Sequence, residues 1–171
     1  MNLSLRPVRF GILLSLISVF VGFALGGVFG AFEDNLKANL KGRAEPVKES
    51  IYGGDEAKME KVVSKSFTYF VRAHLHAGAL GTFGVVACIL ISLLSVPSPL
   101  VQSIHSFAFG LGAFGYSLFW LLAGMRAPAL GGTGAAKESL QWLAIPSAGL
   151  LILGTATLIV VAGLELFRKR A

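Results

Sequence analysis

The residues of this chain best suited to chemistry are gathered near position 75. The stretch RAHLHAGALG, residues 72–81, places Arg72, His74 and His76 at the start of a long apolar run. A helix turns by about 100° per residue, so Arg72 and His76 share one face while His74 points nearly opposite. A regular helix therefore cannot bring both histidines onto one metal ion, unlike the i, i+4 pair of a helical zinc site.

A possible partner for these groups stands at the end of a later apolar run, where Met125 and Arg126 occur. Helices that alternate in direction would bring this point to the same membrane surface as Arg72. His/Met is a known axial pair for haem iron, and arginine suits carboxylates such as haem propionates. The pattern predicts a b-type haem whose iron is held by Met125 and by His76 or His74. Arg72 and Arg126 would pair with its propionates.

The same cluster fits three other interpretations. It could hold a quinone headgroup, with His76 as proton partner and Tyr69 or Trp120 beside it. It could hold a metal ion such as copper. It could also hold nothing, with Arg72 anchoring the helix at the interface and the histidines bonding to neighbouring helices. The residue types alone leave these alternatives open.

The positions of the third histidine and the single cysteine argue against two kinds of haem attachment. A hairpin turning at Pro97 and Pro99 puts His105 roughly 20 Å from His76 at 1.5 Å per residue, so we expect an interfacial or helix-start residue there. A bis-histidine haem is therefore not expected within one chain. Cys88 is the only cysteine, which excludes an intrachain disulfide, and no C-x-x-C-H motif for covalent haem attachment is present.

The stretch RAHLHAGALGTFG, residues 72–84, resembles the histidine-bearing helices of small haem-associated membrane proteins, in which H-x-H is followed by L-G. It more weakly resembles the oxidase subunit I-like group. The resemblance covers one apolar run of four and implies an association with haem. The histidines that this group carries on other helices have no counterpart here, so a full oxidase-type site is not implied.

Composition places these residues in a membrane. The chain has 171 residues, of which 54% are hydrophobic and only 14% charged, whereas soluble domains are about a quarter charged. Apolar runs longer than the ~18 residues of a membrane span account for most of the chain. The net charge of +6 is therefore assigned to membrane orientation and contact with anionic lipid, and nucleic acid is not an expected partner.

We expect an all-α fold, a four-helix membrane bundle forming a single domain over residues 1–171. Proline in the segment VPSP, residues 96–99, ends the second run, and a glycine-rich loop, residues 126–138, follows the third. The first run exceeds the ~7–15 residues of a signal-peptide core, so a retained helix is expected. The predicted spans are 10–32, 67–95, 100–124 and 140–167, with one extracytoplasmic loop at 33–66.

Basic residues predict the sidedness of this bundle. Arg6 and Arg9 precede the first span, and Arg168, Lys169 and Arg170 follow the last. Because Lys and Arg are enriched on the cytoplasmic side, both termini are expected in the cytoplasm of a bacterial cell, with the bundle in its inner membrane.

Two local patterns predict packing. Gly22, Gly26 and Gly30 fall on one helical face and would allow a neighbouring helix to approach closely. The segment DEAKMEKVVSKSF, residues 55–67, has the spacing of a short amphipathic helix that leads into the second span.

No nucleophile and base with an orienting acid can be assembled, so the chain is not expected to be an enzyme by itself. The sequence instead predicts a small integral membrane subunit of a larger envelope complex, of a redox or electron-transport kind. The alternatives are a self-contained b-type haem or quinone-binding protein and a ligand-free structural membrane protein. Expected partners are membrane lipid and either other membrane subunits or further copies of this chain.

Overall fold

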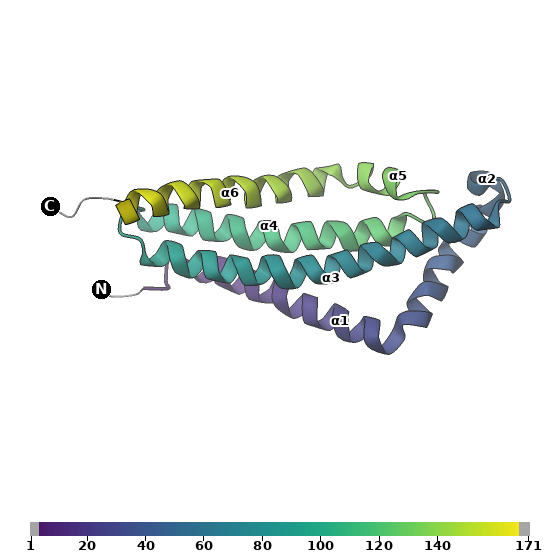
Figure 1. Cartoon of the computed structure of the whole chain (residues 1–171), viewed down its shortest axis with the longest axis horizontal. Coiled ribbons are helices and arrows are strands. Elements are labelled where there is room, and N and C mark those ends of the chain that lie inside the picture. The colour runs from purple at the N-terminus through teal and green to yellow at the C-terminus, as the bar shows by residue number, and fades with distance from the viewer. Residues whose placement is uncertain (1–3, 168–171) are drawn as a thin grey trace.

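The computed structural model describes residues 4–167 and is helical over most of that range, without strands. Four long helices run side by side as a bundle, which confirms the predicted all-α class (Figure 1). Each is long and apolar enough to cross a membrane, as an integral membrane protein requires. The elements are α1 (Arg9–Ala44), the 3-10 turn η1 (Glu45–Val47), α2 (Lys48–Tyr52), α3 (Glu56–Leu93), α4 (Pro99–Arg126), α5 (Thr133–Glu138) and α6 (Gln141–Phe167).

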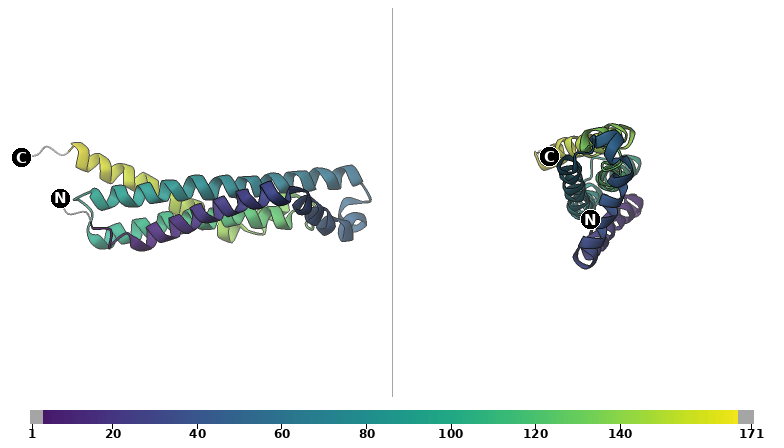
Figure 2. Two further views of the ribbon diagram at one scale, coloured as in Figure 1. Left: turned by 90° about the horizontal axis from the view of Figure 1, so that it is seen from below. Right: turned by 90° about the vertical axis from the view of Figure 1, so that its right-hand side faces the viewer.

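Both ends of the described chain lie at one end of the bundle, called here the termini end (Figures 1 and 2). The assignment of that end to the cytoplasm stays a prediction. Part of its basis, the run Arg168–Arg170, lies outside the described residues. The opposite end, which carries α2 and α5, is called the arm end.

The connection expected at residues 33–66 is mostly helical. Phe32 has non-helical dihedrals (φ −134°, ψ 28°) that bend α1, and the helix then continues to Ala44. Figure 1 shows this second half folding back to the start of α3. We call residues 33–55 the arm. Since α3 has 38 residues and is about 57 Å long, it exceeds a hydrocarbon core of about 30 Å and reaches the arm outside it.

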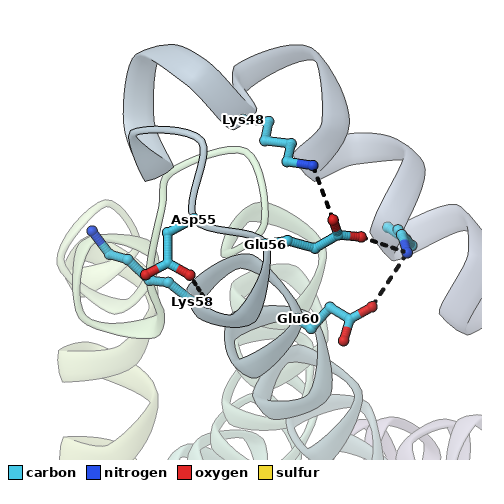
Figure 3. Close-up of polar contacts among 6 residues, drawn as sticks. Lys48, Asp55, Glu56, Lys58 and Glu60 are labelled. Atoms are coloured by element: carbon cyan, nitrogen blue, oxygen red, sulfur yellow. Dashed lines mark hydrogen bonds and ion pairs between the residues drawn. The ribbon is translucent and has the colours of Figure 1, made fainter.

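Ion pairs and a helix cap fix the arm to α3 (Figure 3). Lys41 Nζ lies 3.3 Å from Glu60 and 3.8 Å from Glu56, and Lys48 Nζ lies 3.3 Å from Glu56. The Asp55 carboxylate accepts a hydrogen bond from the backbone N–H of Lys58 at 2.9 Å, which caps the first turn of α3. The predicted amphipathic helix is therefore the first part of α3.

Buried side chains also hold the arm in place. Ala44, Tyr52 and Met59 form a small buried cluster beneath the arm. The Tyr52 hydroxyl donates to the Pro128 carbonyl at 2.6 Å, which ties the arm to the connection after α4. That connection was expected to be a loop and contains the short helix α5.

Three helices form the centre of the bundle, because α1, α3 and α4 all pack on one another. The fourth long helix, α6, packs mainly on α4, and Figure 2 shows it end-on at the side of the bundle away from α1. Pro146 lies inside α6, which runs unbroken to Phe167. Cys88, a free thiol, is buried in the core near the termini end with Ile91 and Phe109.

Two of the three predicted packing glycines take part in packing. A Cβ on Gly22 would lie 2.8 Å from the backbone N of Gly78, and one on Gly26 would lie 2.8 Å from the His74 ring. The expectation for Gly30 is wrong, since a Cβ there would meet nothing within 4 Å. Phe29, the residue before Gly30, still contacts Phe67 and Phe70 of α3, so the two helices remain neighbours at this level although Gly30 itself meets open space.

Candidate ligand site on α3 and α4

Arg72 and His76 meet a group of aromatic rings on α3 and α4. The Arg72 guanidinium carbon lies 4.9 Å from the Trp120 ring centroid and 5.3 Å from that of Tyr69. The His76 ring centroid lies 5.2 Å from Tyr116 and 5.9 Å from Trp120. These five residues, called here the Arg72–His76 site, combine a fixed positive charge with an imidazole and three aromatic faces.

Residues at helical spacing on α3 and on α4 form this site. Tyr69, Arg72 and His76 recur at i, i+3 and i+7 on α3, and Tyr116 and Trp120 recur at i, i+4 on α4. The two helices approach closely just beyond it, where a Cβ on Gly124 would lie 2.9 Å from the backbone O of Ser66. Tyr69 meets Trp120 edge-on at 4.8 Å and is buried, so the aromatic base of the site is rigid.

The polar groups of the site have few hydrogen-bond partners among residues 4–167. The Trp120 indole N–H is buried without a hydrogen-bond partner among the described residues. Arg72 is exposed and His76 half-buried, and the contacts that the structure gives these two side chains are to aromatic rings. An unmade hydrogen bond of a buried donor costs about 1–3 kcal/mol. The site therefore offers several donors to a group that carries acceptor oxygens.

His74 has a different environment. Its Nδ1 lies 2.7 Å from the carbonyl oxygen of Gly22 on α1, and Gly26 leaves room for its ring. A carbonyl only accepts, so Nδ1 carries the proton. His74 and His76 thus face different helices, and the structure does not bring them together. His74 joins α1 to α3.

Met125 and Arg126 lie away from His76. Gly124 packs against Ser66 and Phe70, which come six to ten residues before His76 and hence about 9–15 Å further along α3. Both axial ligands bond the same iron atom, and the b-type haem held by Met125 and by His76 or His74 stays a prediction. Arg126 donates to the Ser139 hydroxyl at 3.2 Å, whereas Arg72 lies on Trp120.

His105 belongs to the contact between α4 and α6. Its Nε2 lies 2.6 Å from the Thr157 hydroxyl, and its Nδ1 lies 3.2 Å from the Val101 carbonyl. Tyr116, which contacts His76, comes eleven residues later on α4, about 16 Å along the axis. His105 and His76 are therefore separate. Among residues 4–167 no group of three or more His, Cys, Asp or Glu side chains could hold a metal ion, and the copper interpretation gains no support.

Tyr116 is the site residue that the sequence interpretation did not name. Its signal is the i, i+4 spacing with Trp120, which matters only once α4 is known to face Arg72 and His76. The likeness of residues 72–84 to haem-associated helices rests on His74 and His76, and these two histidines have different surroundings.

No protein-family model, curated protein or solved structure matches this chain.

Proposed function

We propose that this chain is a small membrane subunit of an envelope redox complex and that the Arg72–His76 site holds the headgroup of a quinone. The observation that carries the proposal is a set of donors that lie among aromatic faces without hydrogen-bond partners in the described part of the chain. Arg72, His76 and the buried indole N–H of Trp120 supply those donors.

A quinone suits this set better than a haem. Its two carbonyl oxygens accept hydrogen bonds from imidazole, guanidinium and indole groups, and its flat ring packs on aromatic faces. Its isoprenoid tail needs only the hydrocarbon of the membrane around α3 and α4. A haem would need a second axial ligand near His76, whereas the rings that lie against His76 are those of Tyr116 and Trp120.

Each residue has a separate task in this proposal. Arg72 stabilises negative charge on the reduced ring oxygens, because a guanidinium stays protonated at every physiological pH. His76 holds and exchanges a proton with one of those oxygens. Tyr69 and Tyr116 fix the positions of the rings around them. The electrons come from redox-active partner subunits of the complex.

Tryptophan fluorescence tests the proposal, because quinones quench indole emission. The chain has two tryptophans, and Trp142 is 69% exposed on the outside of α6. In a Trp142→Phe variant all emission comes from Trp120. A short-chain ubiquinone or menaquinone analogue should quench it saturably in detergent. His76→Ala should raise the apparent Kd by roughly tenfold, the value of one good hydrogen bond.

The Trp120→Phe variant is the matched control, since only Trp142 then emits. Its quenching should rise linearly with quinone, as for a molecule that partitions into the micelle. Equal, non-saturating quenching of Trp120 and Trp142 would contradict the proposal. So would saturable quenching of Trp120 that His76→Ala and Arg72→Gln both leave unchanged.

A further inference from the structure

A groove lies at the termini end, away from the Arg72–His76 site. It has a volume of about 410 Å³ and lies between α1 and α6, both of which pack on α4. Its walls are almost wholly apolar. They include Phe10 from α1, Ile104, Phe107, Ala108 and Leu111 from α4, and Leu150 from α6.

The two ends of the groove differ. At its outer end the Ser103 hydroxyl donates to the Pro7 carbonyl at 2.7 Å, which fixes the start of the chain against α4. Leu111 lies eight residues further along α4, about 12 Å toward the middle of the bundle. The groove therefore runs from the segment that carries the exposed Arg6 and Arg9 inward along apolar side chains, which is the polarity of a phospholipid.

The positive charge of two arginines at the open end of the groove favours an anionic phospholipid. Arg6 and Arg9 flank Pro7, and both are exposed. The Arg9 guanidinium carbon lies 4.8 Å from the Phe10 ring centroid, at the groove wall. The sequence has no acid before Glu33, and the one acid near its other end, Glu165, accepts from the backbone N–H of Val96 at 3.1 Å.

We propose that this groove binds one anionic phospholipid, with its phosphate between Arg6 and Arg9 and one acyl chain along Phe107 toward Leu111. Basic residues near a membrane surface attract anionic headgroups, and basic pockets between helices bind them specifically. Apolar walls favour a hydrocarbon chain over water. The lipid would fill the space between α1 and α6 that no side chain of the described residues fills.

Native mass spectrometry of the delipidated, full-length protein tests this proposal. The probes are phosphatidylglycerol and phosphatidylcholine with identical acyl chains, added in equal amounts. One phosphatidylglycerol should be retained in preference. The double variant Arg6→Gln/Arg9→Gln should weaken its retention by about tenfold or more. Arg126→Gln, at the arm end, is the matched control and should change nothing.

A second pair of variants tests the acyl chain. Ala108→Phe fills the groove and Ile104→Ser makes its wall polar, and both should lower retention of either lipid. Far-UV circular dichroism in lipid-free detergent identifies any variant that fails to fold, and the other variant then decides. Equal retention of both lipids, or retention of phosphatidylglycerol unchanged by the arginine double variant, would overturn the proposal. Displacement by soluble glycerol phosphate alone would also overturn it, since the acyl chain would then contribute nothing.

Discussion

The imidazole Nδ1 of His74 lies 2.7 Å from the main-chain carbonyl oxygen of Gly22, 52 residues earlier in the chain. One turn away, the Ser18 hydroxyl donates to the Ala77 carbonyl at 3.1 Å. Lipid tails are as apolar as the helices, so helices associate in a membrane through close packing and polar contacts of this kind. The contact of α1 with α3 is thus made by hydrogen bonds and glycines.

His74→Leu should therefore destabilise the bundle, whereas His76→Leu should not. Loss of one interhelical hydrogen bond costs about 0.6–1.7 kcal/mol in a membrane protein. Unfolding in mixed micelles with rising sodium dodecyl sulfate, followed by far-UV circular dichroism, measures both variants. Equal free energies of unfolding for the two variants would show that the bond to Gly22 contributes nothing.

Gly22→Ala and Gly30→Ala form a second matched pair. The added methyl group at Gly22 would lie 2.8 Å from the backbone N of Gly78, so α1 and α3 must separate. We expect a loss of about 1–3 kcal/mol for Gly22→Ala from overpacking. Gly30→Ala meets open space and should be neutral or stabilising by up to about 1 kcal/mol. The same unfolding assay checks both, and a larger loss at Gly30 would refute the packing described here.

Tyr52→Phe should loosen the arm without unfolding the bundle. It removes the hydrogen bond to the Pro128 carbonyl, worth about 1 kcal/mol. Hydrogen–deuterium exchange should become faster in α2 and around Pro128 and stay unchanged in α6. The control is Ser50→Ala, because the Ser50 hydroxyl bonds only the nearby Val47 carbonyl. Equal acceleration by Ser50→Ala would mean that the Tyr52 hydroxyl has no special role.

Visible spectra test the separation of His76 from Met125. Oxidised and dithionite-reduced spectra of solubilised protein should be identical for Met125→Leu and the unaltered chain, since Met125 lies well beyond the level of His76. A Soret band that shifts in Met125→Leu would mean that the two residues do ligate one haem. Cys88→Ala serves as a control for general damage to the core.

Features that depend on local periodicity could be predicted from the sequence. The four spans follow from apolar runs, and the proline segment 96–99 separates the second from the third. The division of Arg72 and His76 from His74 follows from helix geometry, and their contacts with α4 and α1 agree with it. The sequence thus named Tyr69, Arg72 and His76 on α3 and Trp120 on α4, and missed Tyr116.

Features that depend on how two helices align could not be predicted from the sequence. Nothing local places Gly124 against Ser66, yet that alignment moves Met125 away from His76 and brings Tyr116 to it. The arm was missed for a similar reason. Its charged residues suggested a solvated loop, but Lys41 is held by Glu56 and Glu60 of α3, 15 and 19 positions later.

The attachment of α6 to α4 has a consequence for biogenesis. The ribosome completes α1, α3 and α4 before it completes α6, and those three helices already contact one another in every pairing. A nascent chain that has released only its first three spans thus already contains the three helices that pack on one another, and Leu158 of α6 is added to their buried core later. The last span packs mainly on α4 and to a lesser extent on α3, so it can join without reopening the contacts among the first three helices.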